Sequence, residues 1–375
     1  MRWNKYLNFF KVILLGSRVT LGAQEDSMQV KVFEWEAGYV GDLSRNFDGG
    51  ISRGNTLMGV LSVGATFRTD KLWQGGEFYF QGMSTHGKGL SAHYVGDQQV
   101  ISSIENGDYW FFFEKFYYRQ NIGNGWLKVG LQDLNQDFLV SDGGSNFINS
   151  SFGIPSTYPL NFSAPIYPKT ALAISGLYNF TDKWSVKLAV FDGDCGSLDD
   201  DKINTKWRLH KQEGFLWVGE LAFKPDERLH IKGGWMYHTA NFTEITDSSK
   251  KQKGVYGMYM LMDYSLVKRS NRSISCFAQI AYHPSKVNYN PLYVGGGFIV
   301  QGYLFNRAND YLGLGAAYAR FYDHSYECDI ECCYFINLNA HISIVPSVHY
   351  VLHPGGKEAD LSNATAGILR VILTK

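Results

Sequence analysis

The chain has 375 residues, and its 35 Lys and Arg residues balance 35 Asp and Glu residues. This neutral balance argues against a nucleic-acid-binding protein, which is normally basic. Mean hydropathy is -0.20, and no run of about 20 apolar residues follows residue 22, so helical membrane spans are excluded. Forty Gly, 24 Tyr, 25 Phe and 9 Trp against only 9 Pro are typical of a transmembrane β-barrel, which uses Gly in turns and aromatic residues at the membrane interfaces.

Residues 1–23 have the features of a secretory signal peptide. Arg2, Lys5 and Lys11 give a positive start, residues 12–15 begin a short apolar core, and Ala23 offers a small residue at a cleavage site. We therefore expect residues 1–23 to be removed and residues 24–375 to form a single barrel domain. The alternative is a poorly ordered N-terminal extension.

Apolar and polar residues alternate with a period of two along most of the remaining chain. In residues 57–68 one face carries Leu, Val, Ala and Phe and the other carries Ser, Thr and Arg. Residues 127–133, 184–190 and 368–373 behave in the same way. A helix would repeat with a period near 3.6, so this pattern predicts an all-β protein.

The links between strands distinguish a membrane barrel from a soluble sheet. About sixteen strands are predicted, starting near residues 30, 57, 73, 109, 125, 169, 183, 214, 228, 253, 273, 295, 310, 332, 346 and 364. Short turns such as 69–71, 121–124, 181–182 and 225–227 alternate with long links at 39–56, 84–108, 134–168 and 193–213. An antiparallel transmembrane β-barrel has short periplasmic turns at one rim and long extracellular loops at the other.

The alternation also predicts which side chains line the pore. A charge that faces lipid near mid-membrane costs about 2–4 kcal/mol, so charged residues on the strands are expected to point inward. The predicted lumen residues on strands are Trp73, Glu77, Tyr79, Lys128, Gln132, Lys187, Glu220, His230, Lys232, His349 and Arg370. Glu114 is added although its strand is apolar on both faces. The alternative for each charged residue is an ion pair that stabilises the wall and never contacts a solute.

The longest link, residues 134–168, is expected to fold inward and to narrow the pore. It carries Asp137, Asn135, Tyr158 and Tyr167, whose side chains suit the hydroxyl groups and ring faces of a sugar. Such residues are equally common in exposed loops, so both interpretations stay open for this segment.

No catalytic, metal or cofactor site is predicted. The sequence contains no Gly-x-Ser-x-Gly and no His-Glu-x-x-His motif, so we expect no enzyme activity. Cys328, Cys332 and Cys333 with His324 match no zinc-ligand spacing. The acidic run 199–201 could bind calcium, but such a run is usually only solvated. Five cysteines leave at least one unpaired.

Several stretches resemble the carbohydrate-selective porins of the OprB family. They are residues 41–54 (GDLSRNFDGGISRG), 129–138 (VGLQDLNQDF), 147–155 (FINSSFGIP), 167–172 (YPKTAL), 305–315 (FNRANDYLGLG) and 345–356 (VPSVHYVLHPGG). The resemblance covers about residues 35–374, and its most specific part is 147–172.

The resemblance implies a monomeric barrel of sixteen strands in the outer membrane of a Gram-negative cell. It would contact outer-membrane lipid and lipopolysaccharide, be inserted by the barrel-assembly machinery, and pass glucose and related small sugars through a polar lumen without a cofactor. The inward Lys and Arg residues keep open a general porin or one that prefers anions or organic acids. A closed barrel that acts as an adhesin or anchor is a further alternative.

Overall fold

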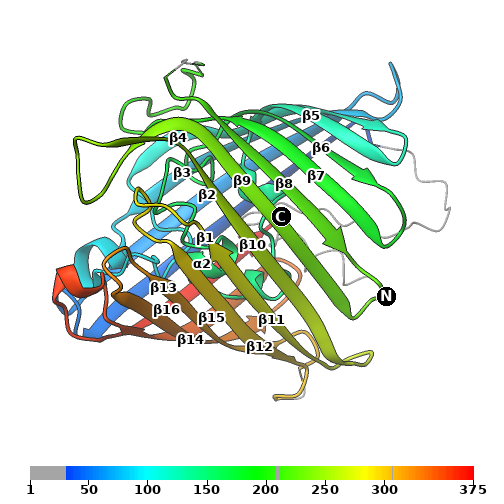
Figure 1. Cartoon of the computed structure of the whole chain (residues 1–375). Coiled ribbons are helices and arrows are strands. Elements are labelled where there is room, and N and C mark those ends of the chain that lie inside the picture. Colours follow the sequence, from blue (N-terminus) through cyan, green and yellow to red (C-terminus); the bar gives the residue numbers. More distant parts are fainter. Residues whose placement is uncertain (1–30, 208, 210–211, 306) are drawn as a thin grey trace.

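The computed structural model describes residues 31–375 except 208, 210–211 and 306. The predicted signal peptide, residues 1–23, lies outside the described residues. The described part forms sixteen strands that close into one antiparallel barrel (Figure 1). The strands are β1 Phe33–Asp48, β2 Gly54–Arg68, β3 Gly76–Gly87, β4 Tyr109–Ile122, β5 Gly125–Gln132, β6 Ala171–Asn179, β7 Trp184–Asp192, β8 Phe215–Phe223, β9 Leu229–Thr243, β10 Lys251–Lys268, β11 Ser273–Tyr282, β12 Leu292–Gln301, β13 Tyr311–Arg320, β14 Tyr326–Asn337, β15 Ile342–Leu352 and β16 Ala364–Thr374.

Each strand pairs with the next along the chain, and the pairing of β1 with β16 closes the ring. In that seam Leu43 lies opposite Leu369 and Asp42 lies opposite Arg370. Closure pairs the backbone amides of every strand on both sides, which a lipid environment demands because no water is present to satisfy them. The predicted barrel and its strand number are therefore confirmed.

The period-two pattern separates a lipid face from an inner face. On β2, Leu61 and Val63 are 46% and 45% exposed while Ser62 between them is 4% exposed. Successive side chains on a strand point to opposite faces, and the exposed apolar residues give the outer wall its lipid-compatible surface.

Short and long links alternate as predicted, with one correction. The predicted link 39–56 is mostly strand, because β1 extends to Asp48 and β2 begins at Gly54. Asp42 and Asn46 point inward and are fully buried. The polar, Gly-containing composition suggested a loop. A strand forms instead because inward polar side chains find partners inside the barrel.

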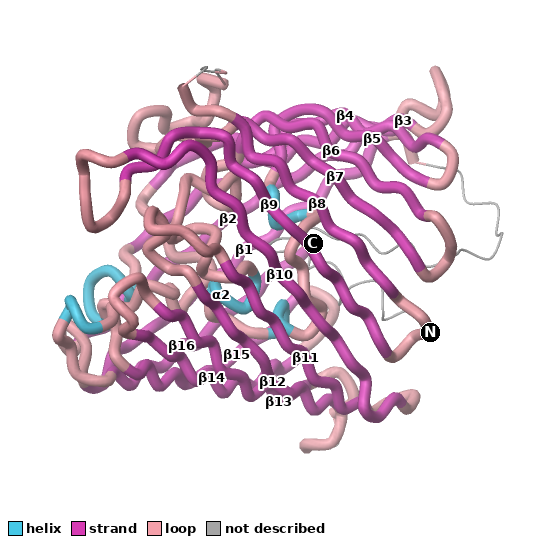
Figure 2. The backbone as a smooth tube through the Cα atoms, in the orientation of Figure 1, coloured by secondary structure: helices cyan, strands magenta, loops and turns pink. Residues whose placement is uncertain are grey.

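Two of the long links, residues 88–108 and 133–170, fold into the barrel (Figure 2). The second contains the short helix α2, Ser150–Gly153, which lies within the ring of strands (Figure 1). Among the described residues, no helix combines the length and apolar character needed to cross a membrane.

The infolded links build a hydrophobic core inside the barrel. The apolar residues of this core with no exposed surface include Leu90, Ile101, Phe112, Phe138 and Tyr158. Phe112 belongs to β4, the strand that is apolar on both faces. Its inward side chain is covered by protein rather than by water. This cover explains why β4 can be apolar on its inner face as well as on its outer face.

The lipid face should tolerate charge only at the rims. Val348, near the middle of β15, is 55% exposed on that face. We expect Val348→Lys to lower the free energy of unfolding by about 2–4 kcal/mol, because it places an ammonium in hydrocarbon. Denaturant titration in lipid vesicles measures this change.

Leu373 is the matched control, since it is also exposed on the outer face but is the penultimate residue of β16. Leu373→Lys should cost only about 0–1 kcal/mol, because the ammonium reaches the interface. Equal costs for both variants would contradict the assignment of this face to lipid.

Candidate functional site

Charged side chains on the inner wall occur mostly in pairs of opposite sign. The ion pairs of inward-facing cations are Arg68–Glu34 (3.0 Å), Lys115–Glu114 (3.0 Å), Arg119–Glu77 (3.8 Å), Lys187–Glu220 (3.2 Å), Arg370–Asp42 (2.8 Å) and Lys128–Asp137. Lys232 instead donates to the carbonyl oxygen of Val140 at 2.5 Å. Most inward-facing cations of the wall therefore lie beside a carboxylate.

Alternate residues of β14 hold the infolded links by their backbone amides. Glu327 accepts hydrogen bonds from the N–H groups of Gln98 (2.8 Å) and Gln99 (2.9 Å). Glu331 accepts from the N–H groups of Ile148 (2.8 Å) and Asn149 (3.0 Å). Each carboxylate is fully buried, so its charge is balanced by donors of a link that would otherwise lack partners.

A second set of wall residues holds the segment 137–144. Glu220 on β8 accepts from the N–H of Leu139 at 3.1 Å. Asp263 on β10 accepts from the N–H of Gly143 and the hydroxyl of Ser141, both at 2.7 Å. Lys187 donates to the carbonyl oxygen of Asp137 at 2.5 Å. The longest link is thus tied to strands on both sides of the barrel, and the prediction that it folds inward agrees with the structure.

Trp73 does not lie on a strand or point into the lumen as predicted. It occupies the turn between β2 and β3, and its indole N–H donates to the hydroxyl of Tyr118 at 2.8 Å. Tyr118 packs on the outward-facing Phe78, with ring centroids 4.9 Å apart. Trp73 is therefore a rim residue of the aromatic belt. The predicted strand began three residues too early, so the alternation assigned it to the wrong face.

Glu114 points inward for a reason that alternation misses. A β-bulge places Lys115 opposite Gln81 but Phe113 opposite Gly82, so Glu114 is the extra residue. Both Glu114 and Lys115 consequently face inward, and both are buried. Without the bulge Glu114 would share the outward face of Tyr118.

Gln132, Arg370 and His349 point inward as predicted but are buried against protein. The Gln132 amide donates to the carbonyl oxygen of Ala173 at 2.8 Å. Arg370 binds both carboxylate oxygens of Asp42 at 2.8 Å and reaches the hydroxyl of Ser102 at 3.1 Å. Arg370 thus joins the wall to the infolded link 88–108, whereas Gln132 bonds to neighbouring strands.

His349 lies between two partners on the inner wall. Its Nδ1 is 2.9 Å from a carboxylate oxygen of Asp329, and its Nε2 is 3.1 Å from the hydroxyl of Ser347. The same Asp329 oxygen accepts from the side-chain amide of Asn149 at 2.7 Å. His349 is therefore connected, through Asp329, to Asn149 of the longest link.

Glu77, Tyr79, Lys128 and Asp137 gather on one stretch of wall near the rim with the short turns. Tyr79 stacks on Tyr117 with ring centroids 5.2 Å apart and donates to Glu36 at 2.8 Å. The predicted residues Glu77 and Lys128 are joined there by ion pairs to Arg119 and Asp137. Lys232 lies on β9, four strands along the ring from β5, and is not part of this group.

Three residues of this stretch were not singled out from the sequence: Trp126, Arg119 and Tyr117. The Arg119 guanidinium lies 5.2 Å from the centre of the Trp126 ring, and the Lys128 ammonium lies 4.7 Å from the centre of the Tyr117 ring. Trp126 shares the parity of Lys128 on β5, so the same alternation could have identified it. The partly exposed ring of Trp126, flanked by the ion pair of Arg119 and Glu77, is a surface of the lumen that a solute can contact.

A cavity of about 240 Å³ lies between the two infolded links. Its lining includes Gln98, Glu105, Asn135, Ser145 and Tyr167. Burial raises the pKa of the Glu105 carboxyl above its usual value. Hydroxyl, amide and carboxyl groups thus line this cavity and can offer hydrogen bonds to a polar solute.

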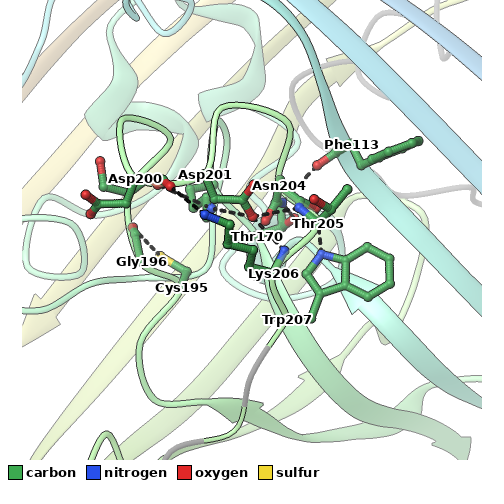
Figure 3. A network of polar contacts seen from close by, with 12 residues as sticks. Phe113, Thr170, Cys195, Gly196, Asp200, Asp201, Asn204, Thr205, Lys206 and Trp207 are labelled. Carbon is green, nitrogen blue, oxygen red and sulfur yellow. Dashed lines mark hydrogen bonds and ion pairs between the residues drawn. The ribbon is translucent and has the colours of Figure 1, made fainter.

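The acidic run 199–201 serves the local structure of the link 193–214 (Figure 3). Asp201 accepts from the N–H groups of Thr205 and Lys206, each at 2.7 Å, and lies 3.9 Å from the Lys169 ammonium. Asp199 accepts from the Tyr109 hydroxyl at 2.8 Å. The carboxylates of Asp199 and Asp201 thus have partners within the protein. All five cysteines are free.

Weakening the hydrogen bonds that Glu331 accepts from residues 148 and 149 should loosen the longest link. We expect Glu331→Gln to weaken the two hydrogen bonds to Ile148 and Asn149, because an amide has one acceptor oxygen and no charge. Hydrogen bonds to charged groups contribute about 1.5–3 kcal/mol each. A loss of about 1.5 kcal/mol corresponds to roughly a tenfold change in an equilibrium constant. Amide hydrogen exchange at residues 148–149 should therefore accelerate at least about tenfold.

Glu358→Gln is the control for this experiment, because Glu358 is an exposed residue whose carboxylate accepts a hydrogen bond from the Tyr322 hydroxyl. The rate of amide hydrogen exchange at residues 148–149 in Glu358→Gln should match the rate in the unaltered protein. Unchanged exchange in Glu331→Gln would contradict the clamp.

The link 88–108 should be held more tightly in acid. Burial, together with the Glu327 carboxylate, raises the pKa of Asp97 well above its usual range. A carboxyl with a raised folded-state pKa stabilises the fold below its unfolded pKa and loses that contribution as pH rises through the folded pKa. Protease cleavage in 88–108 should increase from acid to neutral pH, and Asp97→Asn should reduce that slope. An unchanged slope would contradict the role of Asp97.

Comparisons with known proteins agree with this architecture. Residues 53–374 match the family model "Carbohydrate-selective porin, OprB family". Porin B of Pseudomonas aeruginosa is 21% identical over 406 aligned residues, covering 92% of this chain and 88% of that protein.

Solved structures share the barrel. The high-pH structure of Pseudomonas putida OprB superposes with a TM-score of 0.83 at 18% identity, covering 92% of this chain and 94% of that chain. The low-pH structure gives 0.60 at 15% identity, covering 92% and 93%. The outer-membrane channel DcaP of Acinetobacter baumannii gives 0.57 at 9% identity, covering 96% and 100%. With the family match over most of its length, the chain belongs to the carbohydrate-selective porins of the OprB family, β-barrel channels of the Gram-negative outer membrane.

Proposed function

We propose that the barrel gives passive, selective diffusion to small glucose-like monosaccharides. The observation that carries the proposal is the inner wall near the short turns, where the partly exposed ring of Trp126 lies among paired charges, beside the buried Tyr117. A monosaccharide is uncharged, with hydroxyl groups at its edge and C–H groups on its ring faces. Aromatic planes suit those faces, and the flanking charged groups accept and donate to the hydroxyls.

The pairing of charges favours a neutral solute over an anion. Arg119 and Lys128, the cations of this stretch, lie beside Glu77 and Asp137. An anion would have to compete with carboxylates already in place, whereas a hydroxyl can join an existing ion pair as both donor and acceptor. This disfavours the alternative of an anion- or organic-acid-preferring porin.

Weak binding is part of the proposed function. A channel must hold its solute strongly enough to admit it and weakly enough to release it. The infolded links narrow the barrel, and their clamps fix the narrowing, so selectivity arises without a moving gate. No catalytic step is assigned to the chain.

We further infer that the mature protein starts near residue 24, acts as a monomer and is inserted by the barrel-assembly machinery. The signal-like residues 1–23 and the closed pairing of β1 with β16 support this. A barrel closed within one chain needs no second copy to satisfy its strand edges.

Single-channel conductance with and without glucose tests the sugar proposal. We expect glucose to reduce the current in a saturable manner. Trp126→Ala should weaken that block about fivefold, because an aromatic contact contributes about 1 kcal/mol. Trp126→Phe should restore much of it.

Trp110 provides the control, since it is 89% exposed and lies on β4. Trp110→Ala should leave the glucose block unchanged. Strong anion selectivity in reversal-potential measurements, together with no effect of glucose, would overturn the proposal in favour of the anion-preferring alternative.

A further inference from the structure

Three aromatic rings lie side by side on the lipid face near the rim that carries the long links. Trp217 on β8 lies opposite Tyr237 on β9, and Tyr237 lies opposite Tyr256 on β10. Their side chains are 45%, 41% and 50% exposed. Trp217 is the third residue of β8, directly after the long link 193–214, so this aromatic row lies at the extracellular end of the wall. Such rings mark the boundary between hydrocarbon and headgroups.

Two lysines lie beyond the aromatic row, toward the extracellular rim. Lys251 and Lys253 are the first and third residues of β10, and both are exposed. Gln252 between them lies opposite Phe242, which packs against the core inside the barrel. Because successive side chains on a strand point to opposite faces, the two lysines point outward, about 7 Å apart along the strand.

A β-bulge at Gly254 connects the lysines to the aromatic row. The register shifts between Lys253 and Val255, and Gly254 has a φ of +75°, which glycine adopts without a steric penalty. A Cβ atom at Gly254 would lie 2.6 Å from the Tyr237 hydroxyl, so the polar end of that ring lies next to the backbone beside Lys253. The extra residue keeps Tyr256 on the outward face, three positions below Lys253.

The positive charge of the two lysines is not balanced by the protein. In the same hairpin Lys250 forms an ion pair with Asp247 at 2.9 Å. Within the described ranges, neither Lys251 nor Lys253 forms an ion pair with a carboxylate. Two like charges this close repel each other unless an anion lies between them. This part of the outer face therefore combines an apolar aromatic surface with two free positive charges above it.

We propose that Lys251, Lys253 and the aromatic row bind the lipid A part of one lipopolysaccharide molecule. Lipopolysaccharide forms the outer leaflet of the membrane in which porins of this family lie, and its lipid A carries phosphate groups above its acyl chains. The acyl chains lie against the rings of Trp217, Tyr237 and Tyr256. The phosphates accept charge-assisted hydrogen bonds from the two ammonium groups. The proposal is independent of which solute the channel passes.

The test measures binding of bisphosphorylated lipid A to the mature chain refolded in detergent, by native mass spectrometry. Each lysine close to an anionic lipid contributes about a fivefold factor in affinity. The double variant Lys251→Gln/Lys253→Gln should therefore bind lipid A about twentyfold more weakly, and Lys251→Arg/Lys253→Arg should keep most of the affinity. Lipid A without phosphates should bind the unaltered protein as weakly as lipid A binds the double Gln variant.

Lys71→Gln/Lys183→Gln is the matched control, because it removes two exposed lysines from the short turns at the opposite rim. It should leave the affinity unchanged, and heat-modifiable mobility in gels shows that each variant is folded. Equal weakening by both double Gln variants, or no weakening by Lys251→Gln/Lys253→Gln, would overturn the proposal. Inorganic phosphate at matched ionic strength should not displace lipid A, because it has no acyl chains; displacement would contradict a lipid ligand.

Discussion

The structure depends on the mutual satisfaction of buried carboxylates and loop amides inside the barrel. Glu327 and Glu331 on β14 and Glu220 on β8 are fully buried, and each accepts backbone N–H groups of an infolded link. A buried carboxylate without donors and a buried amide without an acceptor are both costly. When the two groups hydrogen-bond to each other, neither pays the free energy of an unsatisfied buried group. The links are therefore stable inside the barrel although they form few helices or strands.

This constraint divides the interior into two parts. Where the links 88–108 and 133–170 lie, the inner wall is apolar or carries clamps, and the space is a packed core around residues such as Phe112 and Tyr158. Nearer the short turns, Trp126 and the ion pair of Arg119 with Glu77 keep accessible surface, while Tyr117 beside them is buried. The permeation path is therefore shaped by loops in one part and by strands in the other.

The sequence allowed prediction of the barrel because alternation is a local property. The lipid face of β2 and the starts of most strands follow from neighbours two residues apart. The partners of the inward carboxylates, such as Glu220 and Glu331, could not be predicted. Glu220 was placed in the lumen by parity, but its contact with Leu139 N–H joins residues 81 positions apart, and no local pattern encodes such a contact.

Errors arose where the local repeat breaks. The bulge at Glu114 adds one residue and reverses the parity of what precedes it, and the turn containing Trp73 starts where alternation appears to continue. The strand at Asp42–Asn46 was hidden by polar residues whose partners, such as Arg370, lie more than 300 residues away. In this last case the deciding interaction is long-range.

Most charged groups of the wall are used for folding, and this limits which groups can select a solute. Arg370 and Glu331 bond directly to the links. His349 bonds to Asp329, which accepts from Asn149 of a link. Changing these residues alters the shape of the path before it alters recognition. Residues that keep accessible surface, such as Trp126 and Glu77, contact whatever passes. Selectivity in this barrel is therefore carried by a small set of partly exposed side chains, held in place by a larger set that never meets the solute.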